Sequence, residues 1–181
     1  MSRLPLIDRE SAPASVRPTL DAIHGAFGVT PNVFRAVANS PAALASMWGA
    51  FGALGSGTLG AKLGEQIAVA VANRNACNYC LAAHTALGRA AGVSADAMHA
   101  AQSGLSDDPK TAAALRFALK LVNERGAATA DDVAAVRAAG FNDEAIVEIV
   151  AHVALNLFTN YVNVAFAVPV DFAPVALRQA A

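Results

Sequence analysis

The 181-residue sequence predicts an all-α protein, and three observations support this fold class. No segment alternates apolar and polar residues with the enrichment in β-branched side chains that is typical of a strand. Helix-start signals recur along the chain, because Ser, Thr, Asp and Asn residues stand before prolines or acidic first turns. Hydrophobic residues make up 55% of the chain and charged residues only 15%. This composition predicts a single-domain helical bundle that buries further apolar surface in a homo-oligomer.

The first half of the chain begins with an irregular segment. Residues 1–18 contain three prolines and predict an extended arm that wraps the body of the protein or a neighbouring subunit. A helix is expected over residues 19–27, ending at Gly28. Thr30 and Ser40 each precede a proline, so each is predicted to cap a helix that starts with that proline. A loosened region is expected before the next helix because it contains Gly52, Gly55, Gly57 and Gly60.

The second half of the chain is expected to end in four further helices. Each is predicted from a capping residue at its start and a glycine or proline near its end. The sequence places these helices at residues 94–102, 109–126, 129–140 and 142–169. Residues 170–181 are then expected to form an irregular tail.

The only two cysteines, Cys77 and Cys80, stand three residues apart, and His84 follows four residues after the second. On a helix of about 3.6 residues per turn, these side chains fall on one narrow stripe. The polar run at residues 73–75 predicts a turn and an N-cap, followed by a helix that ends near Ala91. The cysteine pair then lies in the first helical turn, where the helix dipole lowers the pKa of a thiol. A redox or metal-binding constellation is therefore predicted.

Three kinds of site fit these residues. In a redox site, Cys80 is the nucleophilic thiol, His84 takes its proton, and Cys77 resolves a sulfenic acid on Cys80 into a disulfide. Glu65 in the preceding helix orients the imidazole, which completes a cycle of peroxide reduction. In a metal site, the same four side chains supply ligand types that zinc accepts. In a structural role, the cysteines only pack. The redox site is preferred because structural zinc sites usually draw on two ligand pairs, and this chain has one.

A polar stripe marks the last predicted helix, which is otherwise apolar. Its members are Glu148, His152, Asn156, Asn160 and Asn163. One interpretation is a solvent-facing stripe, or buried amides that satisfy one another across an interface. The other is a polar wall of the pocket that holds the cysteines, with His152 and Asn156 among the residues that contact the substrate.

Charge and hydropathy exclude several classes of function. The net charge is −1 and no basic patch is visible, so we expect no nucleic-acid partner. The N-terminus lacks the continuous apolar stretch of a signal peptide. No apolar run reaches membrane-spanning length, since polar residues interrupt the closest candidate at residues 146–170. We therefore expect a soluble cytoplasmic protein with no membrane partner. In a reducing cytosol, a lone CxxC is typical of redox or metal chemistry.

The spacing of Glu65, Cys77, Cys80 and His84 resembles that of the alkylhydroperoxidase D-like branch of the carboxymuconolactone decarboxylase family. The sequences Pro-Asn-Val-Phe-Arg from residue 31 and Asn-Ala-Cys-Asn-Tyr-Cys from residue 75 also fit this family. The resemblance covers most of the chain from about Gly28 onward. It is most similar to the subgroup of peroxidase-related proteins.

The resemblance implies an all-helical protomer that assembles as a trimer or hexamer. It also implies that Cys80 is the peroxidatic thiol, Cys77 the resolving thiol, and Glu65 and His84 the proton relay. The implied substrates are alkyl hydroperoxides, and the implied reductant is an external dithiol, such as a lipoylated or thioredoxin-like protein. No metal or other cofactor is expected. Muconolactone decarboxylation is not expected, because members with that activity typically lack the cysteine pair.

One residue departs from the family pattern. Tyr79 stands where the best-understood members carry a second histidine between the cysteines. A tyrosine is not a base near neutral pH, although its hydroxyl can donate a hydrogen bond. We expect Tyr79 to line the substrate pocket.

The order of the two thiol roles depends on two opposing effects. His84 is one turn from Cys80 and two turns from Cys77, whereas the helix dipole favours a thiolate on the more N-terminal Cys77. A histidine at hydrogen-bond distance outweighs a dipole contribution of about 0.3–1 kcal/mol. If Cys77 were the thiol with the lower pKa, the protein would be closer to a thioredoxin-like disulfide reductase.

Overall fold

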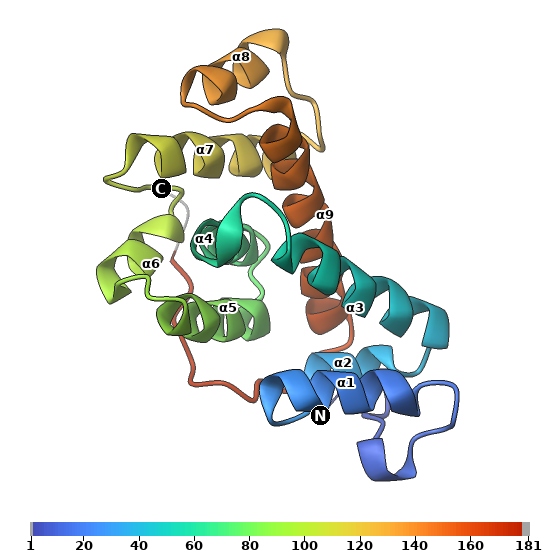
Figure 1. Cartoon of the computed structure of the whole chain (residues 1–181). Helices are drawn as coiled ribbons and strands as arrows, with labels where there is room; N and C mark the ends of the chain where they lie inside the picture. The colour runs from blue at the N-terminus through green and yellow to red at the C-terminus, as the bar shows by residue number, and fades with distance from the viewer. Residues whose placement is uncertain (1, 179–181) are drawn as a thin grey trace.

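The computed structural model describes residues 2–178, which form nine α-helices, one short 3₁₀ helix and no strand. The all-α prediction is therefore confirmed for this part of the chain. In Figure 1, α4 and α5 lie in the middle, α7 and α8 at one end, and α1 and α2 at the other. In chain order the elements are η1 (Arg9–Ser11), α1 (Arg17–Phe27), α2 (Asn32–Val37), α3 (Pro41–Gly55), α4 (Gly60–Arg74), α5 (Asn78–Ala90), α6 (Ala95–Ala101), α7 (Pro109–Asn123), α8 (Ala130–Ala138) and α9 (Asp143–Ala165).

Helix α4 is the centre of the hydrophobic core, because it packs against α5, α6, α7 and α9. Its residues 67–72 form an unbroken buried run in which alanines alternate with larger apolar side chains. Alanines let neighbouring helices approach closely without leaving voids. A short turn joins α4 to α5, so the two helices pack as an αα-hairpin and side chains on their facing sides meet.

Helix α9 runs along the molecule in Figure 1 and contacts α2, α3, α4, α5, α7 and α8. Its 23 residues include a window with a mean hydropathy of 1.4, so length and composition alone would let it cross a membrane. The expectation that no apolar run reaches that length is therefore wrong by this measure. In the fold, 44% of that window is buried. The inward side of α9, including Ile149 and Val153, forms part of the hydrophobic core.

Capping hydrogen bonds confirm five of the predicted helix starts. In each case a side-chain oxygen at the N-cap accepts from a backbone N–H in the first turn, which otherwise has no intrahelical partner. The five capping residues are Ser40, Ser94, Asp108, Thr129 and Asn142.

The predicted cap at Thr30 is wrong. Pro31 itself is the N-cap of α2 and makes no side-chain capping bond. The Thr30 hydroxyl oxygen lies 3.3 Å from Nδ1 of His24 instead, so this side chain links the start of α2 to the last turn of α1.

Two glycine- and proline-based boundaries also differ from the prediction. Helix α3 continues through Gly52 to Gly55, where the glycines predict a loosened region. The helix persists because Leu54, between the two glycines, packs against the core. Helix α9 ends at Ala165 rather than at Pro169, because the backbone turns into a left-handed conformation before the proline is reached.

The N-terminal arm packs onto the same protomer. The backbone N–H of Arg3 donates to the carbonyl of Phe166 at 2.7 Å, and that of Ile7 donates to the carbonyl of Arg35 at 3.1 Å. These bonds hold the arm against the end of α9 and against α2. Met1 lies outside the described residues.

The C-terminal tail crosses the molecule from the end of α9 towards α4 and α6 (Figure 1). Near its start, Asp171 Oδ2 accepts from the backbone N–H of Asn32 at 2.7 Å. Farther along, the backbone N–H of Arg178 donates to Asn73 Oδ1 at 2.8 Å. The segment between these two anchors carries Phe172 across the start of α5. Residues 179–181 of the predicted tail lie outside the described residues.

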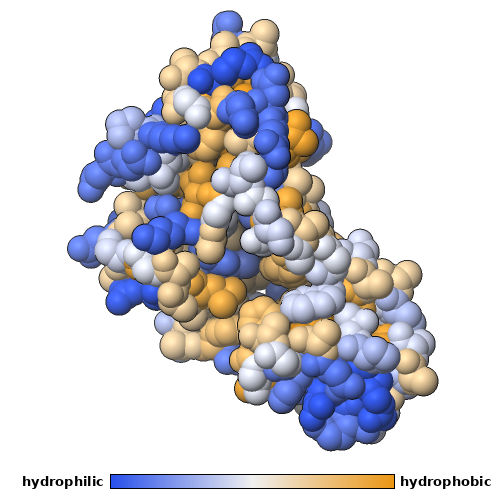
Figure 2. Space-filling model, viewed as in Figure 1, coloured by the Kyte–Doolittle hydropathy of each residue, from blue (hydrophilic) through white to orange (hydrophobic). Residues whose placement is uncertain are grey.

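Figure 2 shows the surface from the same side as Figure 1. Hydrophilic residues gather over the N-terminal segment around η1, whereas the middle of this face is more hydrophobic. The surface is hollowed where α1, α3 and α5 meet.

Candidate active site

The cysteine pair lies at the start of α5, as the sequence predicts, but its local geometry differs in one respect. Helix α4 continues through Asn73 and Arg74, and the turn lies at Asn75 and Ala76, where Ala76 adopts a left-handed φ of 52°. Cys77 is itself the N-cap of α5, so the predicted turn and N-cap at residues 73–75 are wrong. Cys77 and Cys80 are joined as a disulfide, with a Cα–Cα distance of 5.4 Å. The backbone N–H of Cys80 donates to Cys77 Sγ at 3.2 Å. In the reduced protein, this donor favours a thiolate on Cys77.

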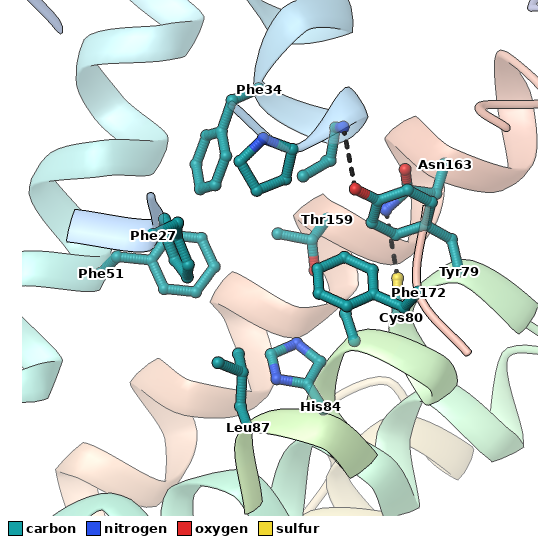
Figure 3. Close-up of a pocket in the computed structure, with 13 residues that line it drawn as sticks. Phe27, Phe34, Phe51, Tyr79, Cys80, His84, Leu87, Thr159, Asn163 and Phe172 are labelled. Carbon is teal, nitrogen blue, oxygen red and sulfur yellow. Dashed lines mark hydrogen bonds between the residues drawn. The ribbon is translucent and has the colours of Figure 1, made fainter. Parts of the chain in front are cut away.

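The two cysteines differ in their contact with a cavity beside the start of α5. Cys80 lines a space of about 40 Å³, here called the sulfur pocket, whereas Cys77 is not among its lining residues. Both residues are buried. The walls of the sulfur pocket are mainly apolar and come from five helices and the tail. They include the aromatic rings of four phenylalanines and of Tyr79, which Figure 3 shows around the cavity. The lining residues are Phe27, Pro31, Val33, Phe34, Phe51, Tyr79, Cys80, Ala83, His84, Leu87, Thr159, Asn163 and Phe172.

Glu65 and His84 form a hydrogen-bonded pair across the α4–α5 hairpin. Glu65 Oε2 lies 2.7 Å from His84 Nδ1, and the two side chains are 21% and 9% exposed. A carboxylate can only accept at this contact, so the neutral imidazole carries its proton on Nδ1. Nε2 is then the unprotonated nitrogen. His84 also lines the sulfur pocket, one helical turn from Cys80, so its ring shares this space with the Cys80 sulfur.

Asn163 is a site residue that the sequence-based candidates omitted. Its Nδ2 donates to Cys80 Sγ at 3.2 Å, a bond drawn in Figure 3. An N–H donor directed at sulfur stabilises a thiolate more than a thiol. The only signal in the sequence was the polar stripe of the last helix, which Asn163 extends by one turn beyond Asn160.

The polar stripe does not face solvent, because Asn156, Asn160 and Asn163 are all buried. Asn160 Oδ1 accepts from Asn75 Nδ2 at 2.9 Å, which ties α9 to the turn before the cysteines. The stripe therefore points into the protein and supports the start of α5.

The first member of the stripe has a different role. Glu148 Oε2 accepts from the backbone N–H groups of Thr58 at 2.8 Å and Leu59 at 3.1 Å. The bond from Thr58 is the main reason why the pKa of Glu148 lies below its usual value. Glu148 thus fixes the turn between α3 and α4 and lies away from the sulfur pocket.

His152 and Asn156 line a second, larger cavity of about 310 Å³, together with Glu65 and His84. Burial lowers the pKa of His152 below its ordinary value, although the negative charges of Glu148 and Glu65 act in the opposite direction. His152 is therefore neutral near pH 7. Of the three weaker substrate-pocket candidates, Tyr79 lies in the sulfur pocket, and the other two lie in this second cavity.

Tyr79 joins α5 to α2 and to the C-terminal tail. Its hydroxyl oxygen accepts from the backbone N–H of Val33 at 3.2 Å (Figure 3). Its ring packs edge-on against Phe172, with 5.8 Å between the ring centroids. Burial, with the nearby Asp171 adding to the effect, raises the pKa of the Tyr79 phenol far above its ordinary value. Tyr79 is therefore a neutral wall residue and not a base at physiological pH.

The described residues also bear on metal binding. Within residues 2–178, no group of three or more His, Cys, Asp or Glu side chains is close enough together to hold a metal ion. The four candidate zinc ligands form two separate pairs. Cys77 and Cys80 are joined by a disulfide, and Glu65 is hydrogen-bonded to His84.

The chain matches known proteins in sequence and in fold. Residues 38–124, which include Glu65, Cys77, Cys80 and His84, match the carboxymuconolactone decarboxylase family. No curated protein sequence matches the chain significantly. One solved structure of similar fold is a peroxidase-related protein from Ralstonia eutropha JMP134 with an alkylhydroperoxidase AhpD core. Its sequence is 26% identical to this chain, and the two structures superpose with a TM-score of 0.83. The match covers 94% of this chain and 92% of that chain.

Two further solved structures share the fold. A peroxidase-related protein from Silicibacter sp. TM1040 is also 26% identical, with a TM-score of 0.80, over 97% of this chain and 92% of that chain. The debrominase Bmp8, solved as a C82A variant with 2,3,4-tribromopyrrole, is 20% identical with a TM-score of 0.78, over 94% of this chain and 92% of that chain. This last likeness concerns the fold alone. The family match over residues 38–124 and the two peroxidase-related structures of the same fold support the resemblance to the alkylhydroperoxidase D-like branch of the carboxymuconolactone decarboxylase family.

Proposed function

We propose that the protein is a thiol-dependent peroxidase that reduces alkyl hydroperoxides with Cys80 and Cys77. The observation that carries this proposal is the position of Cys80. Its sulfur lines the sulfur pocket, shares that pocket with His84, accepts from Asn163, and is within disulfide distance of Cys77. A peroxidatic thiol needs access, a base, a donor that stabilises the thiolate, and a second thiol to resolve it.

The first step is the reduction of the peroxide. His84 Nε2 takes the proton of the Cys80 thiol, while Glu65 holds the ring through Nδ1. The thiolate attacks the terminal oxygen of ROOH, so an S–O bond forms and the O–O bond breaks. The released alkoxide takes the proton from His84 and leaves as ROH. Cys80 is oxidised by two electrons to a sulfenic acid, and the peroxide is reduced by the same two electrons.

The next steps return the protein to its starting state. The Cys77 thiol attacks the sulfenic sulfur, the disulfide forms, and water leaves. An external dithiol then reduces the disulfide by thiol–disulfide exchange and becomes a disulfide itself. We infer that this reductant is a lipoylated or thioredoxin-like protein, and that the enzyme works in the cytoplasm, where such reductants keep thiols reduced. The cycle needs no metal or other cofactor.

We also propose that the protein is a homo-oligomer, a trimer or hexamer. The support is an exposed apolar stripe along the outer side of α9, at helical spacing. Its most exposed members are Val147, Val150, Tyr161 and Val164, which are 67%, 44%, 62% and 50% exposed. A contiguous apolar face of this kind is typical of an interface. Sedimentation as an 18.4 kDa monomer at micromolar concentration would contradict this assembly.

A second candidate is the reductive removal of bromine from an aromatic ring by the two thiols; Bmp8, which shares the fold, is named a debrominase. The aromatic walls around Cys80 favour it. In such a reaction the two thiols supply two electrons, ArBr becomes ArH, and HBr is released as the disulfide forms. The peroxidase is preferred because a space of about 40 Å³ accommodates two oxygen atoms but no substituted ring.

The deciding experiment is a thiol titration of the reduced protein before and after one equivalent of alkyl hydroperoxide. We expect two free thiols before and none after, with one equivalent of alcohol formed. Two thiols that survive the oxidant would exclude the peroxidase. Bromide release from a brominated arene, with the same loss of thiols, would support the second candidate. One tightly bound zinc ion per chain in the purified protein would instead favour a metal site.

A further inference from the structure

The larger cavity beside the sulfur pocket has no part in the cycle described above. Residues from α1, α3, α4, α5 and α9 line it. We call it the glycine chamber, because four glycines contribute to its walls: Gly52, Gly55, Gly60 and Gly64. It shares a wall with the sulfur pocket, made of Phe27, Phe51, His84 and Leu87. Figure 3 shows these four side chains on one side of the sulfur pocket, with Cys80 and Asn163 on the other.

The chamber is kept open by missing side chains. Trp48, Gly52 and Gly55 follow one another at spacings of four and three residues on α3, so they lie on one side of the helix. A Cβ atom added at Gly52 or Gly55 would meet nothing within 4 Å. Glycine inside a helix costs about 0.5–1 kcal/mol relative to alanine. Packing therefore does not require glycine at these two positions. The absence of side chains there leaves open the part of the chamber that Trp48 also lines.

The two cavities differ in what they can hold. The sulfur pocket, at about 40 Å³, has room for about two or three water-sized groups. The glycine chamber, at about 310 Å³, falls in the range of about 300–1,000 Å³ that is typical of pockets for small organic molecules. The oxygen atoms of a peroxide fit the first cavity, whereas a branched or aromatic group fits only the second.

The charges in the chamber select against anions. Its walls include Trp48, Phe51 and other apolar side chains, and among the described residues no lysine or arginine lines it. The polar end consists of Glu65, His84, His152 and Asn156. His152 is neutral near pH 7, and its Nε2 is buried without a hydrogen-bond partner in the described structure. This end therefore offers hydrogen bonds and the Glu65 carboxyl group, but no lysine or arginine that could pair with an anion.

We propose that the glycine chamber binds the uncharged, bulky apolar group of the substrate while the peroxide oxygens reach Cys80 past the shared wall. The identity of the reacting group rests on the proposed function, but binding of the apolar group does not. The chamber therefore selects neutral aryl or branched alkyl hydroperoxides over hydrogen peroxide and over carboxylate-bearing hydroperoxides.

The first test measures binding without any redox step. Trp48 is the only tryptophan in the chain and lines the chamber, so its fluorescence reports occupancy. The probe is 2-phenyl-2-propanol, and the anion 2-phenylpropanoate is its charged counterpart. We expect the alcohol to change the Trp48 emission with saturation, and the anion to bind at least about tenfold more weakly.

Gly52→Leu should place a side chain in the chamber, because Gly52 lines it. The variant should still fold, because leucine is a good helix former and a Cβ at this position meets no atom within 4 Å. Gly49→Leu is the matched control, since Gly49 is also in α3 with nothing within 4 Å but does not line the chamber. We expect G52L to weaken alcohol binding at least about tenfold and G49L to leave it unchanged. Gly55→Leu is the second variant if G52L does not fold. Equal binding by wild type, G52L and G55L would overturn the proposal.

The second test separates this proposal from the proposed function. The rate of oxidation of the reduced protein is measured with cumene hydroperoxide and with hydrogen peroxide. We expect G52L to slow the cumene hydroperoxide reaction at least about tenfold and the hydrogen peroxide reaction less than about twofold. If neither peroxide oxidises the wild type, the peroxidase fails, and the binding result alone decides on the chamber. If G52L slows both peroxides equally, the chamber does not select the organic group.

Discussion

The two sulfurs of the cysteine pair share one helical turn, yet their surroundings differ. Cys80 lines the sulfur pocket, with His84 in the same space and the Asn163 amide directed at its sulfur. Cys77 lies outside that lining and accepts only from the backbone N–H of Cys80 at the helix start. The helix start alone favours a thiolate on Cys77, whereas access, base and side-chain donor all favour Cys80. Tertiary contacts, and not the motif, therefore distinguish the two thiols.

Replacing each cysteine in turn should change peroxide turnover more than any other substitution. Cys80→Ser should abolish peroxide turnover, because the only sulfur in the pocket is lost. Cys77→Ser should still react once and stop at a sulfenic acid, because the resolving thiol is missing. Turnover with an excess of dithiol, and mass spectrometry of the product trapped by a sulfenic-acid reagent, measure these outcomes. Turnover by Cys80→Ser at the wild-type rate would remove the distinction between the two sulfurs.

The base is expected to have the second-largest effect. His84→Ala should raise the pKa of the Cys80 thiol and slow the first step by about a hundredfold or more at pH 7, in the range of general-base contributions. Glu65→Gln should slow it less, because an amide oxygen can still accept from the imidazole Nδ1–H. Single-turnover oxidation of each reduced variant measures the step. If Glu65→Gln were the slower of the two, the carboxylate would act on the sulfur or the substrate and not through the imidazole.

The Asn163 donor should have a smaller effect. Asn163→Ala removes the N–H directed at Cys80 Sγ and should slow thiol oxidation about tenfold, which corresponds to the lower end of the range of about 1.5–3 kcal/mol for a hydrogen bond to a charged group. Asn163→Asp should slow it further, because it also places a negative charge beside the thiolate. The alkylation rate at pH 7 measures both. Wild-type rates in the two variants would show that this contact does not tune the thiol.

The sequence and the structure agree where signals are local. Ser40 and Asn142 are capping residues because the donors they satisfy lie in the next turn, so spacing alone predicts them. Glu65 and His84 are predictable as a pair because one short turn joins their helices. The contact between Asn163 and Cys80 is not predictable in this way, because it spans 83 residues and depends on how α9 crosses α5.

The remaining differences have the same physical origin. Cys77 rather than residues 73–75 caps α5, because the chain needs one left-handed residue, Ala76, to turn out of α4. Gly52 and Gly55 resemble breakers in the sequence, yet the apolar residues around them hold α3 together. The glycine chamber that they help to form is a tertiary cavity, and no local pattern reports one.

Replacing Tyr79 should change the stability of the protein more than the reactivity of its thiols. Of the substitutions considered, it should therefore have the smallest effect on the difference in reactivity between Cys77 and Cys80. Tyr79→Phe leaves the buried N–H of Val33 without its acceptor and should lower the free energy of unfolding by about 1–3 kcal/mol. Tyr161→Phe is the matched control, because Tyr161 is 62% exposed in the protomer and the substitution keeps the apolar ring that faces the proposed interface, so it should cost almost nothing. Urea unfolding of both variants checks the difference. A large loss of thiol reactivity in Tyr79→Phe, with stability unchanged, would instead make the phenol part of the chemistry.

The assignment of Cys80 as the peroxidatic thiol is tested by the pH–rate profile of alkylation of each thiol by iodoacetamide, in reduced Cys77→Ser and Cys80→Ser. The contacts of Cys80 with Asn163 and the pocket it shares with His84 predict that Cys80, in Cys77→Ser, has the lower pKa and reacts faster at pH 7. A lower pKa for Cys77, in Cys80→Ser, would contradict this account. The roles of the two sulfurs would then be reversed, and the protein would be closer to a thioredoxin-like disulfide reductase than to a peroxidase.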